Sequence, residues 1–256
     1  MNRERSTYSV QTVEKAFEIL GLLTEGERDA TLPYLAERLD LSRNKAFRLL
    51  ATLESKGLVE REEKSGVYRL GLTSVELAQR LINSTSLIRH AHPVMERLAR
   101  KHGEAVYITV MKDDEVLFLD MVDCEQNVKA APLVGKRFPF FTNSAGKAIK
   151  ALESTEILER IFKKRGKKDS LPDLAQIENE LQNVRENGFA VDNGGLGEDI
   201  ISVAVAVRDY AGKVVGALTM LGPSFRMAAG RLEEEIVPAL REGAEMLSMR
   251  FGYARM

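Results

Sequence analysis

Apolar residues in the first quarter of the chain recur at steps of three and four, the spacing of amphipathic helices, and then give way to short runs typical of strands. Residues suited to helix ends and turns punctuate the pattern. Thr12 and Ser42 can cap helix N-termini, Gly57 can end a helix in the left-handed conformation, and Gly66 follows Ser65 in a hairpin turn. The predicted elements are helices over 12–23, 32–39 and 42–56 and strands over 58–62 and 67–70. Three helices followed by a hairpin are the order of a winged helix-turn-helix.

The third predicted helix separates apolar and polar residues onto opposite faces, at about 100° per residue. Its apolar stripe consists of Ala46, Leu49, Leu50 and Leu53. The opposite face carries Asn44, Arg48 and Ser55, flanked by Lys45, Phe47 and Thr52. The segment 42–53 contains three basic residues and no acidic one, which favours a phosphate-lined partner. An ordinary amphipathic helix with a solvated face is the alternative, but the preceding turn and the following hairpin favour DNA binding.

The remainder of the chain mixes helical and strand patterns. Thr73 and Glu76 fit a capping box that opens a linker helix ending near Ile82, and Pro93 is expected at a helix break or first turn. Further helices are predicted over 86–101, 145–152, 154–164, 174–186 and 229–251, and strands over 105–111, 115–122, 128–134, 200–207 and 214–221. This order predicts an α/β sensor domain built on one mixed or antiparallel sheet, and an α+β class for the whole chain.

Composition limits the classes of function. A chain of 256 residues with 44% hydrophobic residues is long enough for two domains. It contains neither the roughly 18 consecutive apolar residues of a membrane span nor an apolar signal segment, so we expect a soluble, cytoplasmic protein without a membrane partner. Residues 1–72 hold twelve Lys and Arg against twelve Asp and Glu, and the whole chain carries a net charge of −1. DNA binding therefore depends on a local basic surface.

Few features of the sequence indicate a catalytic site or a metal-binding site. The segment 144–148 lacks the first glycine of a phosphate loop, and His90 and His92 would point apart on a helix. The single cysteine, Cys124, is expected to be a small buried hydrophobe. The basic run over 163–168 is expected to be solvated rather than a second DNA site. We therefore expect no enzyme activity, no catalytic or metal-binding residue and no cofactor.

The motifs of the chain resemble those of the IclR family of bacterial transcriptional regulators, nearly from Val10 to Tyr253. The resemblance is carried by VEKAFEIL at 13–20, LSRNKAFRLLATLESKGLVE at 41–60, YRLG at 68–71, NSAGKAIKA at 143–151, NGFAVD at 187–192 and ISVAVAVRDYAGKVVGALTMLGP at 201–223. It implies a winged helix-turn-helix over 8–72, a linker helix over 73–84 and a GAF-like effector-binding and oligomerisation domain over 85–256. It also implies homodimers or homotetramers.

The resemblance and the pattern together give candidate site residues. Expected DNA contacts are Ser42, Arg43, Asn44, Lys45, Phe47 and Arg48 at the major groove, with Lys64 and Arg69 of the hairpin on backbone or minor groove. The effector contacts that the resemblance implies are Phe138, Ser144, Ala145, Asp192, Ile200, Ser202, Thr219 and Leu221. The chain departs from the family pattern in the loop 193–199, which has three glycines, and at Ser202, where the family often has cysteine.

We accordingly expect a sequence-specific regulator that binds a palindromic double-stranded DNA operator and is controlled by a small effector, either an organic acid or an aromatic metabolite. Two alternatives stay open at this point. A GAF-fold enzyme would turn over its ligand and place a reactive residue such as Cys124 in the pocket. An effector-independent DNA-binding dimer would use the C-terminal domain only for association.

Overall fold

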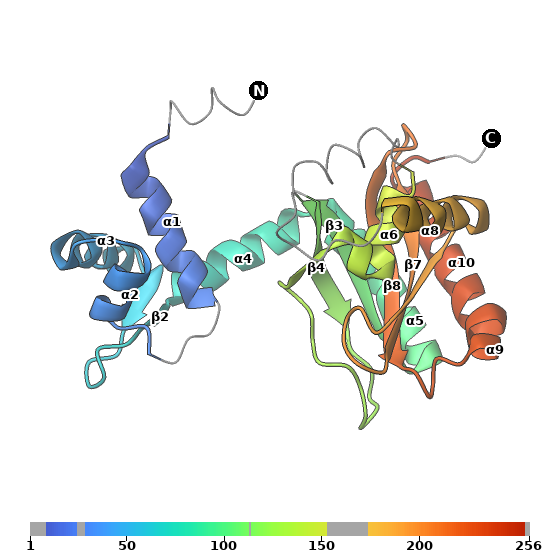
Figure 1. Cartoon of the computed structure of the whole chain (residues 1–256), viewed down its shortest axis with the longest axis horizontal. Coiled ribbons are helices and arrows are strands. Elements are labelled where there is room, and N and C mark those ends of the chain that lie inside the picture. Colours follow the sequence, from blue (N-terminus) through green and yellow to red (C-terminus); the bar gives the residue numbers. More distant parts are fainter. Residues whose placement is uncertain (1–8, 25–28, 113, 153–173, 254–256) are drawn as a thin grey trace. The chain divides into compact units, whose positions relative to one another are not determined.

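The protein is described by a computed structural model that covers the chain except for residues 1–8, 25–28, 113, 153–173 and 254–256. It divides into two compact units, Met1–Ser84 and Thr85–Met256 (Figure 1). The predicted helix over 154–164 and the basic run over 163–168 lie outside the described residues.

The first unit contains three helices, a hairpin and a further helix. They are α1 (Gln11–Thr24), α2 (Leu32–Arg38), α3 (Arg43–Ser55), β1 (Val59–Arg61), β2 (Tyr68–Leu70) and α4 (Leu72–Ser84). Ser42 caps α3, because its hydroxyl accepts a hydrogen bond from the Lys45 N–H at 3.3 Å. Gly57 and Gly66 adopt positive φ angles of 68° and 71° after α3 and in the hairpin turn. The predicted winged helix-turn-helix order is confirmed.

The core of the first unit forms where the apolar stripe of α3 meets the other elements. All four residues of that stripe are buried, and Leu50 is fully buried. The cluster that contains Leu49, Leu50 and Leu53 also contains Ile19 of α1, Leu35 of α2 and Tyr68 of β2. The hairpin joins this core through its backbone as well, since the Tyr68 N–H donates to the carbonyl oxygen of Ala30 at 2.9 Å. The stripe therefore holds α3 in place and leaves its polar face exposed.

Two predicted helix starts in this unit are wrong. Thr12 lies inside α1, which begins one residue earlier, and Thr73 lies inside α4 and does not cap it. The hairpin supplies the missing partners for the first turn of α4. The Thr73 N–H donates to the Gly57 carbonyl oxygen at 3.1 Å, and the Ser74 hydroxyl donates to that of Leu58 at 3.0 Å. Tertiary contacts thus satisfy amides that a capping box would otherwise satisfy.

The second unit is built on one six-stranded sheet. Its strands are β3 (Ala105–Lys112), β4 (Glu115–Val122), β5 (Arg137–Pro139), β6 (Ala190–Asn193), β7 (Ile200–Arg208) and β8 (Val214–Pro223). The spatial order is β5-β4-β3-β8-β7-β6, and every neighbouring pair is antiparallel. Of the two sheet types that the sequence allowed, the antiparallel one is present. The edge strand β6 was not predicted.

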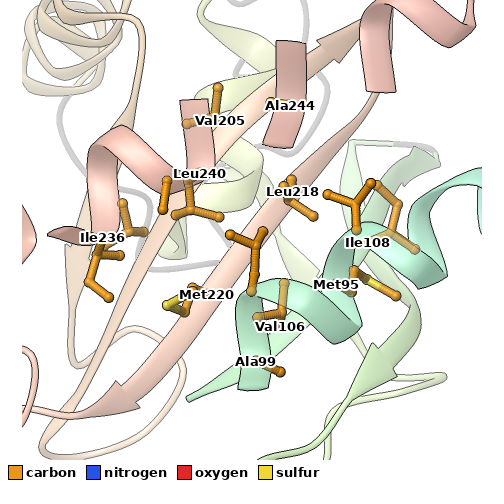
Figure 2. Close-up of a cluster of buried hydrophobic side chains, with 14 of the residues drawn as sticks. Met95, Ala99, Val106, Ile108, Val205, Leu218, Met220, Ile236, Leu240 and Ala244 are labelled. Carbon is orange, nitrogen blue, oxygen red and sulfur yellow. The ribbon is translucent and has the colours of Figure 1, made fainter. Parts of the chain in front are cut away.

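Helices cover both faces of this sheet (Figure 1). They are α5 (Ser86–His102), α6 (Ser144–Lys150), α8 (Leu174–Asn187), α9 (Ala229–Arg231) and α10 (Val237–Arg250), with a 3-10 turn η2 (Phe140–Thr142) and a π-helical turn η4 (Leu232–Ile236). Figure 2 shows the face covered by α5 and α10, where large side chains such as Met95, Ile108 and Leu218 interdigitate. The face covered by α6 is lined instead by small residues and aromatic rings, including Ala204, Ala217 and Phe118. The two sides of one sheet are therefore built differently.

Two further predictions for the second unit are wrong. The segment 128–134 is not a strand, since Val128 and Val134 are 59% and 47% exposed and its apolar alternation does not mark a buried face. Pro93 interrupts nothing, because α5 runs through it. Pro93 and Arg89 both lie on the exposed side of α5, where water can reach the carbonyl oxygen of Arg89 that has lost its helical donor.

A buried ion cluster joins three segments of the second unit. Glu104, which is only 1% exposed, receives hydrogen bonds from Arg226 at 2.7 and 2.8 Å and from Arg231 at 3.0 Å. The same two guanidinium groups also donate to the carbonyl oxygens of Val128 and His102. The cluster fixes the end of α5, the loop after β4 and the loop before α9 to one another.

Candidate functional sites

The structure places all of the predicted DNA-contacting residues on the surface of the first unit. Ser42 and the α3 residues Arg43, Asn44, Lys45, Phe47 and Arg48 are exposed, as are Lys64 and Arg69 of the hairpin. Phe47 is 51% exposed, which is unusual for an aromatic side chain without a partner. Asn44 and Arg48 face outward rather than into the core, as the helical period predicts.

A polar hollow lies beside the exposed face of α3. Its volume is about 480 Å³, and it is lined by Thr12, Ser42, Asn44, Lys45, Arg48, Leu49 and Thr52. The lining residues come from α1 and α3, so the start of α1 borders the surface formed by α3. On the hairpin, Arg69 lies 3.5 Å from the carboxylate of Glu62, which offsets part of its charge. Arg43, Lys45 and Arg48 add three exposed positive charges on α3.

Most of the predicted effector-contacting residues meet on the sheet face covered by α6. Asp192 of β6, Ser202 of β7 and Leu221 of β8 lie directly opposite one another across three strands. Thr219 lies two residues from Leu221 and so points to the same face. Ile200 and Phe138 are half-buried and pack against the apolar cluster of this face. These six predicted residues therefore border one region.

The start of α6 contributes the remaining two residues. Asn143 caps α6 by accepting a hydrogen bond from the Gly146 N–H at 2.9 Å. This places Ser144 and Ala145, both fully buried, against the sheet. The Ser144 hydroxyl donates to the Ser202 hydroxyl at 2.8 Å, which links α6 directly to β7. The region therefore contains a fully buried pair of hydroxyl groups.

A lysine that the sequence analysis did not assign to this region is paired with two carboxylates. The Lys147 ammonium lies 3.0 Å from both Asp192 and Glu180. Burial alone would lower the pKa of Lys147, but its hydrogen bonds to Glu180 and Asp192 raise it above the ordinary lysine value. Asp192 also accepts from the Gly195 N–H at 3.0 Å, so it ties the loop after β6 to α6. These three side chains carry one net negative charge.

The sequence analysis also missed Tyr107. This residue of β3 is fully buried on the same sheet face and lies directly opposite Thr219. Its ring contacts Phe118 edge to face at 5.3 Å, and Phe118 contacts Phe138 in the same way at 5.6 Å. The strand alternation of Ala105, Tyr107 and Thr109 was a usable signal, but only the pairing with β8 shows which residues Tyr107 faces.

Other chemistry is weakly represented in the part of the chain that the structure describes. It contains no cluster of three or more His, Cys, Asp or Glu side chains arranged for a metal ion. Cys124 is a buried free cysteine. None of the helices in the described ranges combines the length and apolar character that a bilayer crossing needs.

Family models match both units. Residues 12–63 match the IclR helix-turn-helix domain, and residues 79–249 match the bacterial transcriptional regulator IclR C-terminal domain. The chain is 30% identical over 249 residues to the HTH-type transcriptional regulator KdgR of Escherichia coli, covering 96% of this chain and 94% of that protein. It is also 30% identical over 256 residues to the glycerol operon regulatory protein of Streptomyces griseus, covering 96% and 98%.

Solved structures agree with these matches. An IclR transcriptional regulator from Alicyclobacillus acidocaldarius superposes with a TM-score of 0.82 at 28% identity, covering 94% of this chain and 99% of that one. An IclR homolog from Microbacterium hydrocarbonoxydans, crystallised with 4-hydroxybenzoate, superposes with a TM-score of 0.76 at 24% identity, covering 95% and 100%.

Proposed function

The chain belongs to the IclR family of bacterial transcriptional regulators, and from this premise we propose that it binds a palindromic operator through α3 and the β1–β2 hairpin and releases or tightens its hold when a small effector binds under α6. It is a DNA-binding transcriptional regulator with an effector domain and not an enzyme, as the sequence analysis expected. We propose below the chemical class of the effector and the residues that contact the DNA and the effector.

The single observation that carries the proposed DNA contact is the exposed polar face of α3, over the segment 42–53 that contains no acidic residue. Since Ser42, Asn44, Lys45 and Arg48 also border one hollow, they can meet a nucleic-acid backbone and base edges together. Arg48 and Asn44 point most directly away from the core and are therefore assigned to base readout. Lys64 and Arg69 are assigned to phosphate contacts beside it.

Arg48→Ala tests this assignment. The loss of one base contact is expected to weaken operator binding by about 1–3 kcal/mol and to relax the preference at one base position. Binding to the operator and to operators with single-base changes would be measured by gel shift at fixed salt. Arg250→Ala, an exposed arginine of α10, serves as the matched control and is expected to have no effect. Unchanged affinity and preference in Arg48→Ala would remove the assignment.

The proposed effector region is supported by the contrast between the two sheet faces. The α5 and α10 face is filled by large side chains, whereas the α6 face combines alanines, aromatic rings and buried hydroxyls. Mostly apolar walls with a few converging polar groups are typical of small-molecule sites. We propose an organic acid or aromatic metabolite as effector, and the neighbour crystallised with 4-hydroxybenzoate supplies a first compound to test.

A homo-oligomer is also proposed, because two helices of the first unit expose large apolar side chains. Phe17 of α1 is 68% exposed, and Leu72 and Leu81 of α4 are 72% and 67% exposed. Large apolar side chains exposed on two helices of one unit mark a surface suited to association with another protein. The occupant we propose is a second copy of the chain, which would also place two α3 helices on the two halves of a palindrome.

Phe17→Glu is expected to weaken the dimer. Loss of a buried phenylalanine from an interface costs about 1.5–3 kcal/mol, and the substitution removes one from each subunit, so the dissociation constant of the dimer should rise roughly 100- to 10,000-fold. Sedimentation equilibrium over a range of concentrations measures this directly. Tyr210→Glu, at an 81% exposed aromatic of the second unit, is the control. An equal effect of both substitutions, or of neither, would argue against this interface.

A further inference from the structure

Two buried hydroxyl groups on the sheet face covered by α6 have no acceptor for their protons among the residues that the structure describes. They belong to Tyr107 of β3 and Thr219 of β8, both fully buried. The two residues lie directly opposite each other in the antiparallel pair, so their side chains point to the same face. A buried hydroxyl proton without an acceptor costs about 1–3 kcal/mol, and two of them on one sheet face call for a physical reason.

The phenol of Tyr107 is a hydrogen-bond donor at any physiological pH. Burial raises the pKa of Tyr107 to about 12; the backbone N–H of Leu133 opposes the rise and the carboxylate of Asp123 adds to it. The Leu133 N–H donates to the phenol oxygen, so it provides no acceptor for the phenol proton. The Thr219 hydroxyl has neither a donor nor an acceptor among the described residues.

The surroundings of the two hydroxyls are apolar and partly aromatic. The rings of Phe118 and Phe138 continue from Tyr107 in edge-to-face contacts, and Ala204 and Ala217 lie on the neighbouring strand positions. The charge of Lys147 is already matched by two carboxylates. Among the described residues of this face, the hydroxyls rather than an ammonium are therefore the donors offered to a ligand.

We propose that Tyr107 and Thr219 donate hydrogen bonds to a carbonyl or carboxylate oxygen of the effector, whose apolar body packs against Phe118 and Phe138. This inference rests on the proposed effector region and adds Tyr107 to it as a specificity-determining residue. Acceptor atoms of the ligand that reach these hydroxyls remove the cost of leaving their protons unpaired.

The test deletes each hydroxyl without changing shape, in the full-length protein. Tyr107→Phe and Thr219→Val are compared with the wild type by thermal unfolding and by calorimetric titration. The probes are 4-hydroxybenzoate and pyruvate as carboxylates, methyl 4-hydroxybenzoate as a neutral carbonyl compound, and 4-methylphenol, which lacks the carbonyl oxygen. Tyr210→Phe, which removes the same hydroxyl from an 81% exposed tyrosine, is the matched control.

We expect at least one carboxylate or the ester to bind the wild type and 4-methylphenol not to bind. Each deletion should weaken that binding roughly 10- to 100-fold, as expected for a hydrogen bond to a charged or strongly polar oxygen. Thr219→Val should leave the melting temperature of the ligand-free protein unchanged or higher, because an unpaired hydroxyl is removed, whereas Tyr107→Phe should lower it slightly through loss of the contact with the Leu133 N–H. Preference for the acid over the ester identifies a carboxylate, and the reverse identifies a neutral carbonyl.

Three results would overturn the inference. The first is that the wild-type protein binds neither the two acids nor the ester. The second is that Tyr107→Phe and Thr219→Val both bind as the wild type does. The third is a marked fall in the melting temperature of the ligand-free variants, which would mean that the hydroxyls stabilise the fold. If a compound changes operator affinity equally in wild type and deletions, the proposed function stands and this inference fails. If the compound binds through these hydroxyls without changing operator affinity, the inference stands and the proposed regulation fails.

Discussion

Replacing Glu104 with alanine is expected to lower the free energy of unfolding of the second unit by about 3 kcal/mol. Removal of one partner from a buried ion pair leaves the other charge uncompensated, at a cost of about 3–5 kcal/mol. Arg226 and Arg231 remain 19% and 24% exposed, so water offsets part of that cost and places the expected loss at the lower end. Urea unfolding followed by far-UV circular dichroism measures the change.

Two further variants test whether burial of the Glu104 carboxylate accounts for the loss of stability. Glu235 also approaches Arg231, at 3.7 Å, but is 59% exposed, so Glu235→Ala should cost less than about 1 kcal/mol. Glu104→Gln keeps the size of the side chain and one acceptor oxygen, and should fall between the two. If Glu104→Ala and Glu235→Ala have equal effects, the cluster contributes no more than a surface ion pair.

The first unit was largely predictable because its signals are local. Ser42 and Gly57 are residue types that commonly begin and end helices, so the ends of α3 can be predicted from the residues next to them. The apolar stripe of α3 follows from helical geometry alone. The predicted caps at Thr12 and Thr73 failed for a complementary reason. The Thr73 N–H donates to the Gly57 carbonyl oxygen, which lies sixteen residues earlier in the chain and which no local pattern indicates.

The second unit was less predictable because its sheet depends on pairings between distant segments. The strand β6 is only four residues long and is defined by its register with β7, which places Asp192 opposite Ser202. The segment 128–134 has strand-like alternation but finds no strand partner. Apolar alternation therefore identifies possible strands, whereas pairing decides which of them form.

The two candidate sites also differ in how far the sequence predicts them. The residues on α3 follow from one helical face, while the effector region is assembled from all six strands of the sheet and α6. Tyr107 was missed because its role depends on lying opposite Thr219, which is 112 positions later in the sequence. Lys147 was considered only as part of a phosphate loop, and its pairing with Asp192 and Glu180 depends on the packing of α6 and α8.

Replacing Leu50 with alanine is expected to unfold the first unit selectively. Leu50 is fully buried in the cluster that holds α3, and a buried leucine truncated to alanine costs about 2–5 kcal/mol. That loss is a large part of the stability of a domain of this size. Operator binding should therefore fall much further than in Arg48→Ala and recover partly on cooling toward the temperature of maximum stability.

The second unit has a separate core, so it should not respond to Leu50→Ala. Calorimetry should show an earlier transition for the first unit and an unchanged one for the second, and any compound that binds the wild type under α6 should bind this variant equally well. Ser55→Ala, at an exposed position of the same helix, is the control and should shift neither transition by more than about 0.5 kcal/mol. A single transition that moves as a whole in Leu50→Ala would mean that the two cores unfold together and that the operator-binding unit has no independent stability.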